Sequence, residues 1–329
     1  MYPYILEAEG ISKQFPGVKA LNKVGIKIKA GSVHALMGEN GAGKSTLMKC
    51  LIGIYHPDEG TIKVKGEAVT FSDTLDALHA GIAMIHQELN LVPHMTVAEN
   101  IWLGREPVHY GFVNHDLLNS KTKDLLKHLN INLKPDILVG ELNIASQQMV
   151  EIAKAVSYDA DVLIMDEPTS ALTEGEVFHL FAIITELKEQ GKGIIYISHK
   201  MDEIFEITDE VSVFRDGMFV ATDKTENLTK QSLITMMVGR ELTHMFPKFN
   251  NNIGEEVLRV SGLQRDGLFR DISFSIKRGE ILGVAGLVGA GRSEVMESLF
   301  GMHPADSGEI FIEGLPVNID SPSKAIEQG

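Results

Sequence analysis

The sequence predicts an α/β fold with a mainly parallel core sheet, an antiparallel β layer and a helical insert, followed by a truncated second copy of the same domain. Three observations support this prediction. Short apolar runs alternate with helical patterns along residues 33–238. Two glycine-rich loops, 38–45 and 286–293, each follow an apolar run and precede a helical pattern. The glycines around the two loops recur at one fixed spacing, which indicates a duplicated domain.

Buried strands are expected where apolar residues form short runs bounded by turn residues. These runs cover residues 33–37, 82–86, 161–166 and 193–198, with a hairpin at 211–222 around Asp216 and Gly217. Helical patterns cover residues 45–52, 117–129, 147–157, 175–190 and 230–238. Strands that alternate with helices are typical of a parallel sheet.

Two segments depart from this alternation. The amino-terminal part has short strands separated by glycine turns, which predicts an antiparallel layer. Residues 92–157, approximately, contain no strand-like run, so we expect a helical insert there.

The repeat defines the predicted domains. Six glycines, Gly31, Gly38, Gly43, Gly53, Gly60 and Gly66, recur 248 residues later as Gly279, Gly286, Gly291, Gly301, Gly308 and Gly314. A first domain is therefore expected at 1–243, a polar linker at 244–256 and a second copy at 257–329. Because Gly329 matches Gly81, the second copy is expected to be incomplete.

The composition restricts the class of protein. Hydrophobic residues make up 44% of the 329 residues, which is ordinary for a globular protein. The 45 acidic and 30 basic residues give a net charge of −15, so nucleic acid is not an expected partner. A single cysteine, Cys50, suggests a reducing compartment. With no apolar run of about 18 residues and no signal peptide pattern, we expect a cytosolic protein, or one that docks on a membrane through a partner.

Residues 38–45, GENGAGKS, have the pattern of a phosphate-binding loop between a strand and a helix. Glycines let successive backbone N–H groups point at phosphates, and the following helix adds its dipole. Lys44 is expected to reach the β- and γ-phosphates, and Ser45 to ligate Mg²⁺. The predicted nucleotide contacts are Gly38, Glu39, Asn40, Gly41, Ala42, Gly43, Lys44, Ser45 and Thr46.

Four polar residues at strand ends complete the predicted catalytic site. Asp166 ends an apolar strand and is expected to hold Mg²⁺ through water, while Glu167 orients or deprotonates the attacking water. Gln87 and His199 follow two other strands. Ligands bind at the carboxyl ends of such strands, so we expect Gln87 to ligate the ion and His199 to contact the γ-phosphate or position the water.

Together these motifs resemble the ATP-binding domains of ABC transporters. Their order is that of the family: phosphate loop, Gln87, helical insert, signature, DEPTSAL at 166–172 and His199. Phe15, 23 residues before Gly38, matches the aromatic residue on which the family stacks adenine. The resemblance covers essentially the whole chain and implies ATP and Mg²⁺ as cofactors, with ATP hydrolysis as the activity.

Within the family, two fused domains without membrane helices look like the ATPases of bacterial monosaccharide importers. This resemblance implies galactose or methyl galactoside as the transported sugar, with ribose as the next alternative. It also implies membrane permease subunits and, through them, a periplasmic sugar-binding protein as partners, with a second ABC half in cis. The protein is then expected to be peripheral, at the cytoplasmic face of the inner membrane. The family contacts its permease through the insert, where Trp102 and Arg105 are candidates.

The chain departs from the family pattern at three places. The signature LSGGQ is replaced by LNIAS at 142–146, and Thr173 stands where the family usually has aspartate. In the second loop, GLVGAGRS, Arg292 replaces the lysine. The nucleotide contacts expected there are Gly286, Gly291, Arg292 and Ser293.

The family's head-to-tail pairing brings two of these departures together, because the loop with Arg292 then faces LNIAS. We interpret this as an asymmetric motor in which that site binds ATP and turns it over slowly. The intact loop then performs hydrolysis.

Two other functions stay open. A soluble tandem ABC ATPase acting on ribosomes or nucleic acid needs a basic connector, whereas residues 244–256 are mixed in charge. A regulatory nucleotide-binding module without catalysis is the other alternative, and the presence of Glu167 argues against it.

Overall fold

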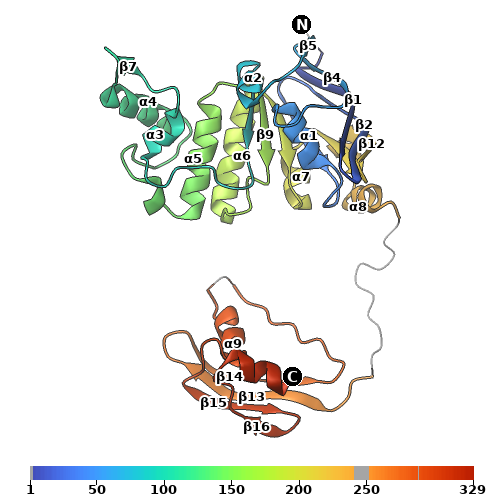
Figure 1. Ribbon diagram of the computed structural model, residues 1–329, viewed down its shortest axis with the longest axis vertical. Helices are drawn as coiled ribbons and strands as arrows, with labels where there is room; N and C mark the ends of the chain where they lie inside the picture. The colour runs from blue at the N-terminus through green and yellow to red at the C-terminus, as the bar shows by residue number, and fades with distance from the viewer. Residues whose placement is uncertain (1–2, 241–251, 288) are drawn as a thin grey trace. The chain divides into compact units, whose positions relative to one another are not determined.

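The computed structural model describes residues 3–240, 252–287 and 289–329. The chain divides into two compact units, Met1–Thr243 and His244–Gly329, coloured blue to orange and orange to red in Figure 1. Most of the predicted linker, residues 244–251, lies outside the described residues. In the described part of the chain, no helix combines the length and apolar character needed to cross a membrane.

The first unit is built on a six-stranded sheet with the strand order β12-β11-β3-β10-β9-β6. All neighbouring strands are parallel except β11 and β12, so the predicted mainly parallel core sheet is confirmed. The strands are β3 (Ser32–Met37), β6 (Ile82–Ile85), β9 (Val162–Asp166), β10 (Gly193–Ile197), β11 (Glu210–Arg215) and β12 (Met218–Lys224). The central strands are buried on both faces because helices cover the sheet, which explains their continuous apolar runs.

A second sheet, of four strands, forms the antiparallel layer. Its order is β2-β1-β4-β5, and its strands are β1 (Leu6–Phe15), β2 (Val18–Ile28), β4 (Glu59–Val64) and β5 (Glu67–Val69). Leu6 and Ile28 of this layer share one hydrophobic cluster with Leu36 of the core sheet and Leu47 of a helix. The two sheets therefore enclose the helix that follows the first glycine-rich loop.

Eight α-helices are described in the first unit. They are α1 (Lys44–Leu51), α2 (Thr74–His79), α3 (Val97–Trp102), α4 (His115–His128), α5 (Ile144–Val156), α6 (Glu174–Glu189), α7 (Met201–Ile207) and α8 (Lys230–Val238). The predicted helices correspond to α1, α4, α5, α6 and α8, with ends shifted by up to three residues. The helices α2, α3 and α7 are not predicted by the sequence pattern, because they have six or seven residues each and are too short to show a helical period.

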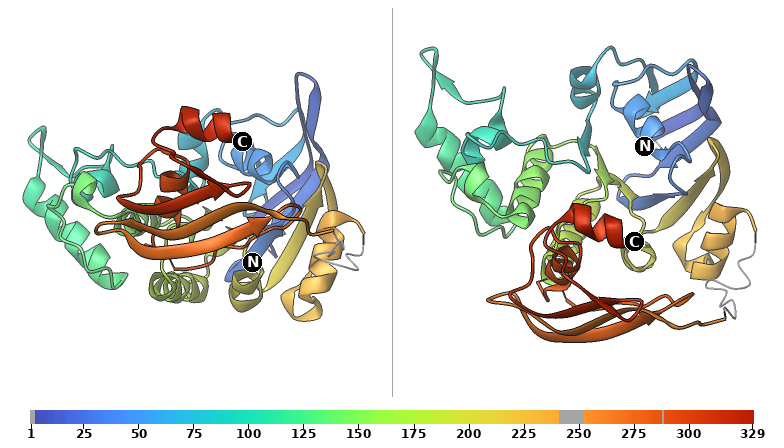
Figure 2. Two further views of the ribbon diagram at one scale, coloured as in Figure 1. Left: turned by 90° about the horizontal axis from the view of Figure 1, so that it is seen from below. Right: turned by 60° about the horizontal axis from the view of Figure 1, so that its bottom comes forward.

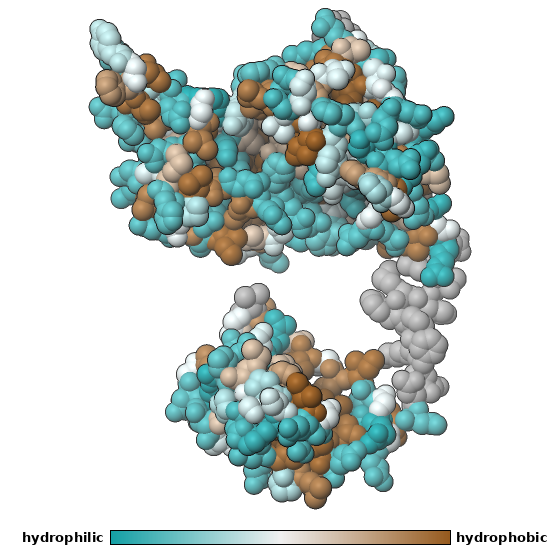
Figure 3. Space-filling view, in the orientation of Figure 1, coloured by the Kyte–Doolittle hydropathy of each residue, from teal (hydrophilic) through white to brown (hydrophobic). Residues whose placement is uncertain are grey.

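The insert contains α3, α4 and α5, which group at one side of the unit (teal and green in Figure 2). The expectation of an insert without strands is wrong in one detail, because β7 (Val108–His109) pairs with β8 (Phe112–Val113). Tyr110 and Gly111 between them have φ of 48° and 84°, as a tight hairpin turn requires. Strands of two residues are too short to be predicted from a sequence pattern. Apolar and weakly polar side chains cover the protruding end of the insert (Figure 3), where Tyr110 is 90% exposed.

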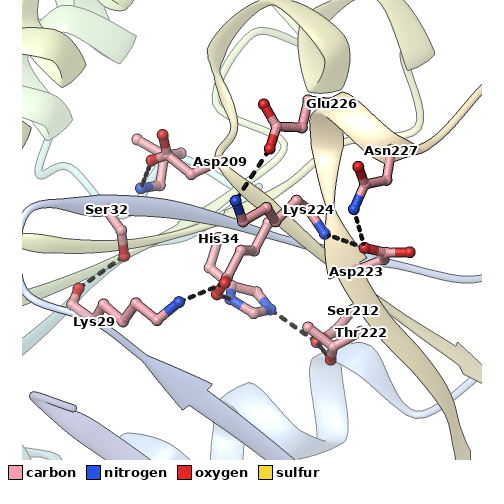
Figure 4. Close-up of polar contacts among 12 residues, drawn as sticks. Lys29, Ser32, His34, Asp209, Ser212, Thr222, Asp223, Lys224, Glu226 and Asn227 are labelled. Carbon is pink, nitrogen blue, oxygen red and sulfur yellow. Dashed lines mark hydrogen bonds and ion pairs between the residues drawn. The ribbon is translucent and has the colours of Figure 1, made fainter. Parts of the chain in front are cut away.

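A buried polar cluster lies near the edge of the core sheet (Figure 4). His34 of β3 is 2% exposed, and its Nε2 lies 2.8 Å from Oγ of Ser212. Its Nδ1 has no hydrogen-bond partner among the described residues and lies 3.7 Å from the Glu210 carboxylate, which accepts from Lys29. Burial lowers the pKa of His34 to about 4, although the charge of Glu210 opposes this shift. The folded chain therefore holds His34 neutral.

This burial predicts a pH-dependent stability. Between the ordinary pKa of 6.5 and about 4, the unfolded chain binds a proton at His34 that the folded chain does not. The free energy of unfolding should therefore fall as the pH falls through this window, by up to about 3 kcal/mol from this group. Urea unfolding followed by the fluorescence of Trp102, the single tryptophan, measures it at pH 7.5 and pH 4.5.

In His34→Gln, the loss of stability between these two pH values should be smaller than in the wild type. The matched control is His128→Gln, because His128 is 54% exposed and pairs with Glu186 at 3.3 Å. An equal loss in wild type and His34→Gln would contradict the prediction.

The second unit contains a four-stranded antiparallel sheet with the order β14-β13-β15-β16, the same arrangement as β2-β1-β4-β5. Its elements are β13 (Glu256–Arg265), β14 (Phe269–Lys277), α9 (Arg292–Leu299), β15 (Ser307–Ile312), β16 (Leu315–Val317) and α10 (Pro322–Gln328). Val260, Phe269, Val295 and Ile310 form part of its small core. Residues 280–287 form neither strand nor helix, and Ile281 there is 94% exposed.

Candidate functional site

The loop at 38–45 lies between β3 and α1, and its glycines are required by their surroundings. Gly38, Gly41 and Gly43 have φ of 155°, 83° and 98°, which residues with a side chain rarely adopt. A Cβ atom at Gly38 would lie 2.4 Å from the Phe214 carbonyl oxygen, and one at Gly43 would lie 2.7 Å from Leu21. The backbone therefore follows the sharp path that directs N–H groups into the turn ahead of α1.

Lys44, the first residue of α1, lies over this loop. Its ammonium group donates to the carbonyl oxygens of Gly38 at 2.7 Å and Glu39 at 3.0 Å. Burial lowers the pKa of Lys44, whereas the nearby carboxylates of Asp166 and Glu167 oppose that shift. The loop thus holds a half-buried cation beside two acidic side chains.

A cavity of about 690 Å³ opens in front of the loop. Its lining includes seven of the predicted contacts, which are Phe15, Asn40, Gly41, Gly43, Lys44, Ser45 and Thr46. Phe15 is half-buried and packs edge-on against Tyr55, with ring centroids 5.1 Å apart. Five further residues line the cavity and were not predicted as nucleotide contacts, namely Val18, Lys19, Ala20, Asp216 and Gly217.

Gly217 also supports the loop directly. Its N–H donates to the Ala42 carbonyl oxygen at 3.3 Å, and its own carbonyl accepts from the Asn22 N–H at 2.8 Å. A Cβ atom at Gly217 would lie 2.8 Å from the Ala20 carbonyl oxygen. The predicted hairpin at Asp216 and Gly217 is therefore part of the cavity wall. The sequence pattern predicts the hairpin, but it does not predict the contact of the hairpin with a loop about 175 residues earlier in the chain.

Three of the residues predicted at strand ends lie together. Asp166 ends β9, and Glu167 follows with a left-handed φ of 49° and an N–H that donates to the Ile197 carbonyl oxygen at 2.9 Å. The Glu167 Oε1 lies 3.2 Å from Nδ1 of His199, whose side chain is 70% exposed. Burial raises the pKa of Asp166, the charge of Glu167 raises it further and Lys44 opposes the shift.

Gln87 is the fourth predicted residue. It follows β6, the edge strand that pairs directly with β9. Gln87 is exposed and, like Asp166, Glu167 and His199, is not among the described residues that line the cavity. Its predicted part in ion binding therefore stays a prediction.

Asp166 and Ser45 suit a magnesium ion. The Asp166 carboxyl is partly buried, has a raised pKa and lies near Lys44, and Ser45 places a hydroxyl on the cavity wall. The described residues contain no group of three or more His, Cys, Asp or Glu side chains arranged to hold a metal ion. Mg²⁺ usually takes one or two protein oxygens, waters and phosphate oxygens, so these two residues fit that ion.

The second glycine-rich loop has a different setting. Gly291 caps α9 with a φ of 81°, and Arg292 and Ser293 begin that helix as exposed residues. A Cβ atom at Gly286 would lie 3.4 Å from Cδ of Arg292, so the arginine side chain passes close to the start of the loop. Val288 lies outside the described residues. No strand precedes this loop in the described range 280–287.

The unusual residues at 142–146 and 173 have clear local roles as helix caps. Asn143 caps α5, because its side-chain oxygen accepts from the Ser146 N–H at 2.8 Å. Ile144 then begins the helix with a side chain that is 60% exposed. Thr173 is the N-cap residue of α6, and its N–H and hydroxyl group both donate to Oε2 of Glu176 at 2.8 Å.

Trp102 and Arg105, the two candidates for the permease contact, form hydrogen bonds within the insert. Trp102 Nε1 donates to Oγ1 of Thr122 at 3.0 Å. Arg105 donates to the carbonyl and hydroxyl oxygens of Ser157 and stacks 3.6 Å from the ring centroid of Tyr158. These contacts give both residues a structural role in the insert. Tyr158 also lines a groove of about 470 Å³ between α2, β6 and α5.

Comparison with known proteins finds matches that cover most of the chain. The ABC transporter family matches residues 21–170 and 269–328. A putative ribose/galactose/methyl galactoside import ATP-binding protein of Agrobacterium fabrum is 60% identical over 324 residues, which cover 98% of this chain and 63% of the relative. The corresponding protein of Burkholderia lata is 59% identical over 326 residues, covering 99% and 62%. The chain thus spans less than two thirds of the length of these relatives.

Two solved structures show the same fold. A nucleotide-free ATP-binding cassette from an ABC transporter has a TM-score of 0.63 and 25% identity, covering 74% of this chain and 100% of that one. The ADP conformation of an ATP-binding cassette of an ABC transporter has a TM-score of 0.63 and 27% identity, covering 72% and 99%. Both the predicted family and the predicted nucleotide-binding fold are confirmed.

Proposed function

Because this chain belongs to the ABC transporter family, we propose that its first unit binds and hydrolyses ATP to power the import of a monosaccharide. One observation carries the proposal: the cavity of about 690 Å³ joins the phosphate loop to Phe15. Beside Lys44 of that loop lie Asp166 and Glu167, and Glu167 contacts His199.

Each residue has a defined task in the proposed reaction. The N–H groups of the loop and the amino end of α1 bind the phosphates, and Lys44 offsets their charge. Ser45 and Asp166 would hold Mg²⁺, which neutralises phosphate charge when it is bound, and Gln87 remains its third proposed ligand. Phe15 stacks on the adenine.

Hydrolysis needs a water molecule aimed at the γ-phosphorus. The Glu167 carboxylate accepts a hydrogen bond from that water and takes its proton as the new P–O bond forms. The bond to the β–γ bridging oxygen breaks, and ADP and inorganic phosphate leave. His199, 3.2 Å from Glu167, orients the carboxylate and donates to the γ-phosphate.

The transported sugar and the partners are inferred from the relatives. Their names point to ribose, galactose or methyl galactoside, of which we propose galactose or methyl galactoside first. Import requires membrane permease subunits and, through them, a periplasmic sugar-binding protein. We place this protein on the cytoplasmic face of the inner membrane. A soluble ATPase that acts on ribosomes or nucleic acid is not favoured, since these relatives are import ATP-binding proteins.

The second unit is proposed to be the amino-terminal part of a second ABC domain, at 257–329 after a linker at 244–256. Its sheet order and the helix after its glycine-rich loop support this assignment. Ile144, whose side chain is exposed where the family has a glycine, and Arg292 both depart from the family pattern, and a nucleotide site built with them is proposed to turn ATP over slowly.

The groove between α2, β6 and α5 is the proposed permease contact. Leu75 of α2 lines it and is 55% exposed, and Leu78 and Met84 add apolar surface. Replacing Leu75 with glutamate puts a charge on this surface, which is costly to bury in an interface. We expect the amount of permease that co-purifies with the protein from its native cells to fall at least about 10-fold, which corresponds to about 1.4 kcal/mol of binding free energy.

The matched control is Leu117→Glu, on α4, where the leucine is 44% exposed and does not line the groove. ATP binding should be unchanged in both variants, and the permease should be lost only from Leu75→Glu. Equal recovery of the permease with both variants would exclude the groove as its binding site.

A further inference from the structure

Glu203, the third residue of α7, is an acidic side chain in the interior that the proposed reaction does not use. Its side chain is 8% exposed. The carboxylate accepts hydrogen bonds from the hydroxyl groups of Thr169 at 2.7 Å, Tyr196 at 2.8 Å and Ser198 at 2.9 Å. The Lys200 ammonium lies 3.1 Å away. One carboxylate therefore accepts from four donors in two segments of the chain, Thr169 and residues 196–200.

Two of these donors lie beside the proposed catalytic pair. Thr169 is two residues after Glu167, and Ser198 directly precedes His199. Through these two hydrogen bonds, Glu203 connects the loop after β9 to the loop after β10. Lys200 strengthens this connection, because its ammonium group also donates to the carbonyl oxygen of Thr169 at 3.3 Å.

The catalytic pair needs such support. The His199 side chain is 70% exposed, so packing does not fix its position. Glu167 has a left-handed φ of 49°, a conformation that persists in a non-glycine residue only where the surrounding structure holds it. Besides the side-chain contact between Glu167 and His199, a hydrogen bond from the Glu167 N–H to the Ile197 carbonyl oxygen joins the ends of β9 and β10.

The charge of Glu203 suits the role of a common acceptor. Burial raises the pKa of its carboxyl, but the hydrogen bonds from Thr169, Lys200, Tyr196 and Ser198 together hold the pKa below its ordinary value. Glu203 is therefore ionised at neutral pH and acts purely as an acceptor. An amide at this position has one acceptor oxygen and two N–H donors, so the four donors could not all be satisfied.

We propose that Glu203 is a positioning residue of the ATPase site, which holds the loops of Glu167 and His199 at the separation that lets these two side chains meet. The inference rests on the proposed ATP hydrolysis. Glu203 does not touch the substrate. It acts through the orientation of Glu167, so its removal should slow the chemical step without weakening nucleotide binding.

The test uses the native protein in single-turnover hydrolysis, with nucleotide affinity measured separately. Glu203→Gln is expected to slow phosphate release about 10-fold, with the Kd for ATP within about twofold of wild type. Thr169→Val removes the donor on the Glu167 loop and should have a similar effect. Tyr196→Phe is the matched control, because it removes one donor from the same carboxylate but leaves both loops attached. It should keep near-wild-type hydrolysis.

A double variant separates positioning from general stability. In a His199→Ala background the pair no longer exists, so adding Glu203→Gln should slow hydrolysis little further. The inference is overturned if the two substitutions multiply, or if Thr169→Val and Tyr196→Phe slow hydrolysis equally. If the wild-type protein itself releases no phosphate, the proposed function fails and the inference fails with it. A hydrolysing wild type with an equally fast Glu203→Gln variant overturns the inference alone.

Discussion

Replacing Glu167 with glutamine is expected to slow phosphate release from bound ATP at least about 100-fold while ATP binding stays near the wild-type level. Glutamine has the size of glutamate but cannot take a proton from water. Asp166, the residue before it, would still hold Mg²⁺, and Lys44 would still bind phosphate. The loss should therefore appear in the chemical step alone.

The geometry around Glu167 makes glutamine the informative substitution. The backbone at Glu167 is left-handed, with a φ of 49°, and its N–H is bonded to Ile197. Glutamine can keep this backbone and a polar contact with His199, whose Nδ1 lies 3.2 Å from the Glu167 carboxylate. Alanine would remove the contact as well as the proton acceptor, so the two causes could not be separated.

Single-turnover phosphate release and the Kd for a fluorescent ATP analogue measure the two effects separately. Glu174→Gln is the matched control, because Glu174 lies seven residues later at the exposed start of α6. It should hydrolyse ATP at the wild-type rate. A Glu167→Gln variant within about threefold of wild type would show that another group activates the water.

The closeness of Asp166, Glu167 and His199 could be expected from the sequence because these residues lie at strand ends. Asp166 follows one apolar run and His199 another, and parallel strands bring their carboxyl ends to the same edge of the sheet. The register of β9 and β10 then pairs Asp166 with Ile197, which brings Glu167 close to His199. Glu167 and His199 are 3.2 Å apart because each follows the end of one of these two paired strands.

Features that depend on packing between distant segments could not be predicted in this way. The cavity wall at Gly217 depends on a turn that meets the loop only in the folded protein. Arg105 was a candidate for the permease contact, and its hydrogen bond to Ser157, 52 residues away, shows no pattern in the sequence. The hydrogen bonds that converge on Glu203 join residues up to 34 positions apart and show no motif of their own.

The two glycine-rich loops should behave very differently towards nucleotide. We expect Lys44→Ala to weaken the Kd of this chain for ATP about 100-fold, whereas Arg292→Ala should leave it within about twofold. An ammonium group that binds phosphates makes charge-assisted hydrogen bonds worth about 1.5–3 kcal/mol each, and a 100-fold loss, about 2.7 kcal/mol, corresponds to one or two such bonds. The wild-type chain should accordingly bind one ATP tightly, at the loop of Lys44, and bind ATP at the loop of Arg292 much more weakly.

The difference arises from the surroundings of each loop. Lys44 lies in a loop fixed by β3 and by the hairpin at Gly217, on the wall of a cavity of about 690 Å³. Arg292 is exposed, and the apolar segment before its loop, residues 280–287, forms no strand. Phe15 ends β1, whereas β13, the corresponding strand of the second unit, ends in Arg265 and offers no aromatic ring for the base.

Isothermal titration of the chain with a non-hydrolysable ATP analogue measures both the affinity and the number of sites. Lys44→Ala and Arg292→Ala are matched, since each removes the basic residue that begins the helix after its loop. The decisive comparison is therefore between two variants of equal net charge. Two sites of equal affinity per chain, or an equal loss of affinity in the two variants, would show that the arginine loop binds nucleotide as tightly as the lysine loop does.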